Sequence, residues 1–174
     1  MTRATAPLAI ALTLLAAPAL AMTLTSADIG PGAVIAKAQI YPRCGGENVS
    51  PQLAWGGAPA RTKSFVLTMI DLDVKPAQWS HWIVVDLPAS TAALPRGLKA
   101  LPAPASAVAG NFGDRAYAGP CPPTGTGVHH YQFTIWAMPT AHFSIAPDAK
   151  ADGLAALIGK QALDKASLTG SVTR

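Results

Sequence analysis

Three runs of apolar, β-branched and aromatic residues stand out along the chain, and such runs are typical of buried β-strands. They span residues 64–71, 81–87 and 131–138. Pro88 and Pro139 end the second and third runs. The third run alternates apolar and polar side chains less cleanly than a solvent-facing strand does, so we expect protein on both of its faces. Weaker strand candidates lie at 23–26 and 52–55.

Connections rich in proline and glycine separate these runs and indicate the fold class. They span residues 42–51, 56–61, 74–79, 88–106 and 110–128. Short strands joined by long loops are typical of a β-sandwich or barrel, and not of alternating strands and helices. Helical spacing occurs only after Pro147, where Asp148 can cap a helix. The sequence therefore predicts a mainly β fold with a short C-terminal helical segment, whose buried face carries Leu154, Leu157 and Ile158.

Composition narrows the class of protein further. The 174 residues are 50% hydrophobic and only 13% charged, which excludes intrinsic disorder and leaves enough apolar material for a core. The 13 lysines and arginines are scattered singly, so the net charge of +4 does not indicate a nucleic-acid partner. Because no repeat or linker divides the chain, we expect residues 22–174 to form a single domain.

Residues 1–21 have the features of a secretory signal peptide. Arg3 supplies a basic start, the stretch 7–20 is apolar, and the segment ends in an Ala-x-Ala pattern at Ala21. The apolar stretch is too short for the roughly 20 residues that a membrane-spanning helix needs. We therefore expect cleavage after Ala21 and a periplasmic or secreted mature protein.

The two cysteines, Cys44 and Cys121, admit two interpretations. An even number of cysteines in an exported protein favours a disulfide, because the compartment is oxidising. No spacing rule links positions so far apart, so they could instead be two separate small residues beside a pocket. The disulfide is the favoured prediction of the two.

Residues that can carry chemistry gather where the strong strands begin or end. Asp71 and Asp73 follow the first strand, and His81 opens the second between two tryptophans. A loop with three glycines and three prolines leads to His129 and Tyr131 at the start of the third strand. Side chains two apart on a strand point the same way, so these two should share a face that His130 does not.

Taken together, these motifs resemble those of the phosphatidylethanolamine-binding protein family, in particular its bacterial YbhB/YbcL-type branch of Raf kinase inhibitor-like proteins. The motifs are Asp71-x-Asp73, Trp79-x-His81-Trp82, and Gly119-Pro120-Cys121-Pro122-Pro123 followed by Gly127-x-His129-x-Tyr131. The likeness extends upstream to Cys44-Gly45-Gly46-Glu47-Asn48-Val49-Ser50-Pro51, Trp55 and Thr62-Lys63-Ser64-Phe65. It covers residues 23–140, which is most of the mature chain.

The resemblance implies a fold and a ligand site. The family fold is an antiparallel β-sandwich, and its small pocket accepts phosphate, acetate or a phosphorylated head group. By motif position, the ligand-binding residues are Asp71, Trp79, His81, Gly119, Pro122, His129 and Tyr131. Imidazolium and phenol groups can donate hydrogen bonds to phosphate oxygens, and a carboxylate can select the tautomer of a neighbouring histidine. We expect no cofactor and no metal, and leave peripheral lipid contact and a homodimer open.

This sequence departs from the family pattern at two places beside the pocket. The usual Asp-Pro-Asp-Ala-Pro reads Asp71-Leu72-Asp73-Val74-Lys75-Pro76, which removes a proline and adds a cation. The residue between His129 and Tyr131 is His130, where the family has arginine or lysine. We therefore expect a pocket of the same kind, with a ligand preference that the sequence does not define.

Two functions from different classes follow from these residues. The favoured one is a non-catalytic module that binds a small anion or phosphorylated head group. The alternative is a phosphoesterase or esterase that uses His81 or His129 as general base. Catalysis is the weaker reading because the motifs contain no obvious nucleophile: Cys121 precedes two prolines and has no helix N-terminus to activate it. No local metal-binding spacing occurs either.

Overall fold

The computed structural model describes residues 21–146 and 151–174, in which two antiparallel sheets pack face to face. The smaller sheet has the order β1 (Thr23–Thr25), β2 (Leu53–Gly56), β5 (Ala93–Leu94). The larger sheet has the order β6 (Ser106–Val108), β4 (Trp79–Pro88), β3 (Ser64–Asp71), β7 (Val128–Met138), β8 (Asp164–Thr173). The helical elements are η1 (Lys37–Gln39), η2 (Pro42–Cys44) and α1 (Ala151–Gly159).

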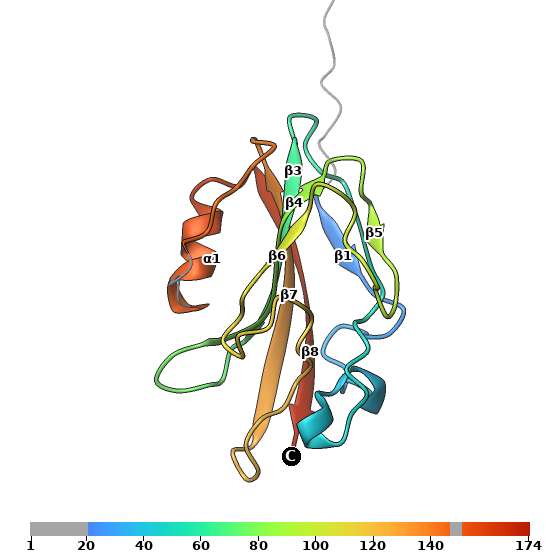
Figure 1. Cartoon of the computed structure of the whole chain (residues 1–174), viewed down its shortest axis with the longest axis vertical. Helices are drawn as coiled ribbons and strands as arrows, with labels where there is room; N and C mark the ends of the chain where they lie inside the picture. Colours follow the sequence, from blue (N-terminus) through green and yellow to red (C-terminus); the bar gives the residue numbers. More distant parts are fainter. Residues whose placement is uncertain (1–20, 147–150) are drawn as a thin grey trace, which may run out of the picture.

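The predicted β-sandwich is confirmed, and it carries an additional helical layer. Figure 1 shows α1 on one side of the larger sheet and the smaller sheet on the other. Strand β3 is buried along its whole length because its alternating side chains enter two separate cores. Leu67 and Met69 lie in the core between the sheets, whereas Val66 packs with the residues under α1. The expectation that both faces of the third strand are covered is confirmed for the same reason.

The chain ends in a strand that the sequence did not reveal. Strand β8 pairs with β7 along its whole length, from Val128 opposite Thr173 to Ala137 opposite Asp164. One of the inward-facing positions of β8 is Gly170. Glycine is unfavourable inside a strand, so the sequence indicated a strand here only weakly. In the fold, Gly170 faces Ile35 and Ile29 so closely that a Cβ atom would overlap both side chains. The glycine is therefore explained by a tertiary contact and not by local preference.

The predicted helix is present, but the prediction that Leu157 belongs to its buried face is wrong. Leu154 and Ile158 are 1% and 0% exposed and pack against the larger sheet, whereas Leu157 is 37% exposed. Positions 154 and 158 are one helical turn apart and therefore lie above one another, while 157 is rotated towards solvent. Asp148 and the predicted signal peptide up to residue 20 lie outside the described residues.

Loops from distant parts of the sequence meet at the end of the sandwich where β3 ends and β7 begins. A disulfide joins Cys44 of η2 to Cys121, with the Cα atoms 5.5 Å apart. The Asn48 side chain accepts a hydrogen bond from the Gly119 amide at 2.8 Å and donates to the Tyr117 carbonyl at 3.1 Å. A Cβ atom at Gly119 would collide with the Gln39 carbonyl. The loop that carries Gly119 can therefore approach the η1 segment this closely only because it has a glycine there.

Candidate functional site

A buried carboxylate–imidazole pair lies at the end of β3. Asp71 is 2% exposed, and its Oδ2 accepts a hydrogen bond from Nδ1 of His129 at 2.7 Å. The antiparallel register that places Asp71 opposite Tyr131 brings the neighbouring His129 within reach. The carboxylate assigns the proton to Nδ1, and Nε2 then lies 2.9 Å from Oγ1 of Thr126. Asp71 therefore orients a histidine, as the family motif suggested.

His81 lies at the start of β4 and is almost completely buried. Its Nδ1–H donates to the Ala118 carbonyl at 2.9 Å, which leaves the lone pair of the neutral ring on Nε2. Burial lowers the pKa of His81, although the Ala118 carbonyl and the charge of Asp71 act in the opposite direction. In the ligand-free protein, His81 is therefore a neutral imidazole at neutral pH and would have to gain a proton to hold an anion as an imidazolium.

The indole Nε1–H of Trp79, beside His81, is buried and has no acceptor within the described part of the chain. The Tyr131 ring lies edge-on to His81, with the centroids 5.1 Å apart. Burial, the nearby Asp71 charge and the Asp71 carboxylate as hydrogen-bond acceptor raise the pKa of Tyr131, so its phenol keeps its proton. Because a buried donor without an acceptor is costly, the Trp79 N–H marks a place where a ligand or water can bind.

A cavity of about 230 Å³ opens beside these groups. It is lined by Asp71, Val74, Trp79, His81, Phe112, Cys121, Pro122 and Pro123. Four of the seven predicted ligand-binding residues are therefore in its wall: Asp71, Trp79, His81 and Pro122. The other three are next to lining residues without lining the cavity: His129 bonds to Asp71, Tyr131 contacts His81, and Gly119 is held by Asn48.

Phe112 is the lining residue of most consequence that sequence reasoning left out. Its ring stacks on Tyr41 at 5.2 Å and meets Trp79 and His81 edge-on at 5.6 and 5.2 Å. It thus joins the η1–η2 segment to the start of β4. An aromatic residue within the polar turn Asn111-Phe112-Gly113-Asp114 was the available signal, since turns seldom carry large apolar side chains without a packing role.

His130 points away from the cavity, as the two-residue period of a strand predicts. Its side chain is exposed, and Nδ1 lies 2.9 Å from Oδ2 of Asp73. The same oxygen accepts the His130 backbone N–H at 2.6 Å. Burial opposes ionisation of Asp73, but the hydrogen bonds from His130 outweigh it and lower the pKa of the carboxyl. The two aspartates therefore serve two different histidines on opposite faces of β7.

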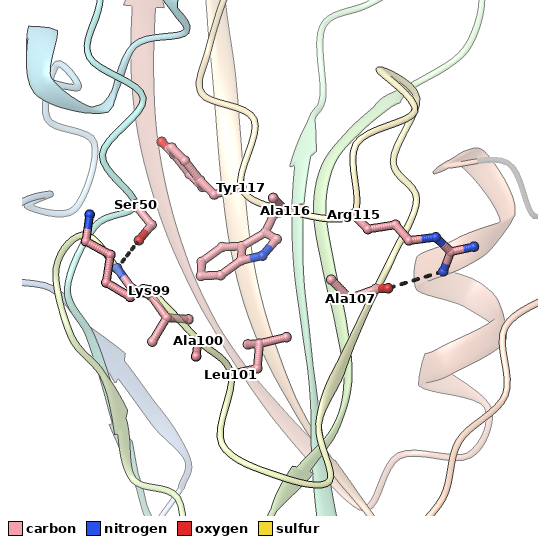
Figure 2. A pocket seen from close by; sticks show the side chains of 10 residues that line it. Ser50, Lys99, Ala100, Leu101, Ala107, Arg115, Ala116 and Tyr117 are labelled. Atoms are coloured by element: carbon pink, nitrogen blue, oxygen red, sulfur yellow. Dashed lines mark hydrogen bonds between the residues drawn. The ribbon is translucent and has the colours of Figure 1, made fainter.

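A second cavity, of about 220 Å³, lies between the sheets and is shown in Figure 2. Its polar groups already bond within the protein: the Leu98 amide donates to Ser50 Oγ at 2.9 Å, and the Tyr117 hydroxyl donates to the Gln39 carbonyl at 2.9 Å. The Arg115 side chain extends towards the Ala107 carbonyl (Figure 2). Because the Ser50 and Tyr117 hydroxyls are engaged within the protein, this cavity lacks, among the residues that the structure describes, a buried donor without an acceptor such as the Trp79 N–H beside His81.

Comparison with known proteins identifies the family. The family model described as phosphatidylethanolamine-binding protein matches residues 25–173. This chain belongs to the phosphatidylethanolamine-binding protein (PEBP) family. The UPF0098 protein YbcL of Escherichia coli K12 is 37% identical over 151 residues, which cover 82% of this chain and 80% of YbcL. The PEBP likeness thus extends beyond the motifs, through β8 to the end of the fold.

Structural comparison supports the same PEBP fold. The crystal structure of Escherichia coli YbcL, described as a new member of the mammalian PEBP family, superposes with a TM-score of 0.81 at 30% identity. The match covers 89% of this chain and 99% of that one. A relative from Mycobacterium tuberculosis H37Rv, 33% identical over 150 residues (86% of this chain, 71% of the relative), is named "Putative lipoprotein LppC". Within residues 21–146 and 151–174, no helix is long and apolar enough to cross a membrane.

Proposed function

We propose that this PEBP-family protein is exported and binds a small anion or phosphorylated head group in the cavity beside His81, without catalysing a reaction on it. The observation that carries the proposal is the buried Trp79 Nε1–H, which has no acceptor within the described residues and lines one small cavity together with His81. Ionised phosphate and carboxylate oxygens are strong acceptors, so they complement such a donor. The family relationship supports the same class of ligand.

The size of the cavity favours a head group over a whole lipid. Its volume of about 230 Å³ is below the roughly 300 Å³ at which pockets for drug-sized ligands begin. Val74, Phe112 and Pro122 supply an apolar wall, which can cover the carbon atoms of a short ester or ethanolamine group. A small ligand offers few atoms to hold, so we expect dissociation constants near the millimolar range.

The side chains near the cavity that could act as a nucleophile are already bonded to other groups, which favours binding over catalysis. The Asp71 carboxylate is paired with His129, and Cys121 is in the disulfide. The Thr126 hydroxyl near His129 donates to the Pro123 carbonyl at 2.7 Å. Its proton is therefore not offered to Nε2 of His129, as a nucleophile–base pair would require.

Replacing polar side chains that line the cavity should weaken binding in a graded way. We expect His81→Ala to lower the affinity for inorganic phosphate by at least about tenfold. Trp79→Phe, which keeps the ring and removes one N–H, should lower it about fivefold, the effect of losing one hydrogen bond. His130→Ala is the matched control, because its side chain faces away from the cavity. NMR titration of the four proteins measures these affinities.

Two results would contradict this assignment. One is undiminished binding in both His81→Ala and Trp79→Phe, or a loss confined to His130→Ala. The other is turnover of phosphate or carboxylic ester substrates that His129→Ala abolishes, because it would identify a hydrolase in place of a binding protein. Circular dichroism of each variant, including His129→Ala, controls for misfolding.

Binding should also strengthen as the pH falls. An anion favours the imidazolium form of His81, whereas burial lowers the pKa of His81 in the free protein. Protonation on binding is therefore costly at neutral pH and becomes easier below about pH 6.5, the ordinary histidine value. Glycerophosphoethanolamine is the ligand to titrate, because its phosphodiester keeps one negative charge. Equal affinity at about pH 5 and about pH 8 would exclude a linked histidine proton.

The proposed export rests on the first 21 residues and on the lipoprotein name of the mycobacterial relative. We expect the protein recovered from a cell envelope to begin at Met22 or within a few residues of it, because signal peptidase cuts after the Ala-x-Ala pattern. N-terminal sequencing or intact mass measures the end directly. Recovered envelope protein that still begins at Met1 would contradict cleavage.

A further inference from the structure

A hydrogen-bonded chain of Asp86, His142 and Ser144 lies at the other end of β4 from His81. Oδ2 of Asp86 is 2.7 Å from Nδ1 of His142, and Nε2 of His142 is 2.9 Å from Oγ of Ser144. None of the three residues lines the cavities described above, and none belongs to the motifs of the binding site. The chain is therefore a separate chemical feature of the molecule.

A β-bulge aims Asp86 at this chain. The register of β3 against β4 shifts between Phe65 and Leu67, so that two residues of β4, Val85 and Asp86, oppose Val66 alone. Asp86 has a φ of 60°, a left-handed conformation that is uncommon outside glycine. Bulges of this kind redirect a side chain and occur often beside active sites. Here the bulge turns a carboxylate towards the segment before α1.

The second oxygen of Asp86 holds that segment in place. Oδ1 accepts the backbone N–H of Phe143 at 2.8 Å, and the Phe143 side chain is buried in the core under α1. Asp86 itself is only 8% exposed. The carboxylate is thus anchored between two donors, which fixes the His142 ring relative to the backbone that carries Ser144.

The direction of the protons follows from these contacts. A carboxylate only accepts, so Nδ1 of His142 carries the proton and Nε2 carries the lone pair. The Ser144 O–H therefore donates to Nε2, which is the order in which an Asp–His pair activates a serine nucleophile. The His142 side chain is 75% exposed and Ser144 is exposed, so a reagent in solution can reach both.

The chain of Asp71, His129 and Thr126 provides an internal comparison. Its two histidine contacts have the same lengths, 2.7 and 2.9 Å. The Thr126 hydroxyl, however, donates to the Pro123 carbonyl, and His129 is only 4% exposed. Ser144 differs in both respects: its proton is directed at the histidine, and the histidine is open to solvent. The two chains should therefore differ in reactivity despite their shared residue types.

We propose that Ser144 is an activated nucleophile that accepts an acyl group from an activated carboxylic ester. Ser144 Oγ forms a bond to the acyl carbon while its proton moves to Nε2 of His142, and the ester bond to the leaving alkoxide or phenoxide breaks. Asp86 stabilises the imidazolium that forms, and His142 then returns the proton to the leaving group or to water. The products are acyl-Ser144 and the alcohol or phenol, and no further reactant is needed.

Acetylation by p-nitrophenyl acetate tests the proposal. We expect the full chain to release p-nitrophenolate in a burst of one equivalent, and tandem mass spectrometry to locate the acetyl group on Ser144. Ser144→Ala should abolish the burst, and His142→Gln should slow it about a hundredfold, the usual contribution of a general base. Thr126→Val is the matched control and should leave the burst unchanged.

The outcomes separate this proposal from the alternatives. A burst of equal size in Ser144→Ala, an unchanged rate in His142→Gln, or acetylation at Thr126 or at lysines only would each overturn it. Ser144 is exposed and its replacement leaves the Asp86–His142 contact in place, so thermal unfolding of Ser144→Ala followed by circular dichroism should match that of the parent protein. Circular dichroism also checks that His142→Gln, which removes a partner of Asp86, is folded. The binding of phosphate near His81 should be unaffected, so the two sites can fail independently.

Discussion

Removal of the Cys44–Cys121 disulfide is expected to lower the free energy of unfolding by about 4 kcal/mol. The bond closes a loop of 77 residues, and in the chain-entropy model a loop of this length restricts the unfolded chain by that amount. The Cα separation of 5.5 Å lies within the usual range for disulfides, so the native backbone needs no rearrangement to form it. Since ordinary domains are stable by only about 5–15 kcal/mol, a loss of this size is a large fraction of the total.

Urea unfolding of the oxidised protein, the reduced protein and the Cys44→Ser/Cys121→Ser double variant measures this effect. The reduced protein and the double variant should agree, since both lack the same constraint. The loss of the bond should also alter the cavity proposed to bind the ligand, because Cys121 is part of its wall. An unchanged unfolding midpoint on reduction, or two free thiols by alkylation of the oxidised protein, would show that the bond does not stabilise this fold.

Truncation of Ile158 is expected to cost about 3 kcal/mol, within the range for buried aliphatic side chains cut to alanine. Ile158 is 0% exposed and packs with Leu154, Trp136 and Val66 in the core between α1 and the larger sheet. Ile158→Ala therefore leaves a cavity in a layer that is only one helix thick. The unfolding midpoint in urea, at unchanged slope, measures the change.

Leu157→Ala is the matched control for this core. It removes a leucine from the same helix at a position that is 37% exposed, so it should cost less than half as much. If the two variants are equally destabilised, α1 packs on the sheet by a different face. If neither is destabilised, the helix contributes little to the stability of the fold.

Local patterns determined the central strands and the general position of the site. Residues 64–71 form β3 with the same bounds as the sequence prediction, because β-branched and aromatic residues favour a strand and both faces are buried. The period of two placed His129 and Tyr131 on the buried face of β7 and His130 on the exposed face. The family motifs likewise located Asp71, Trp79, His81 and Pro122, which meet at one cavity.

Tertiary contacts decided the remaining features, because their causes lie far away in the sequence. Strand β8 is ordered by pairing with β7, and its Gly170 is explained only by the closeness of Ile35. Phe112 lines the cavity because it packs between Tyr41 of the η1–η2 segment and Trp79 at the start of β4. No local signal predicts the bulge that turns Asp86 towards His142, since it arises from the pairing of β4 with β3. Propensity and period act within a few residues, whereas register and loop packing depend on partners that only the folded chain brings together.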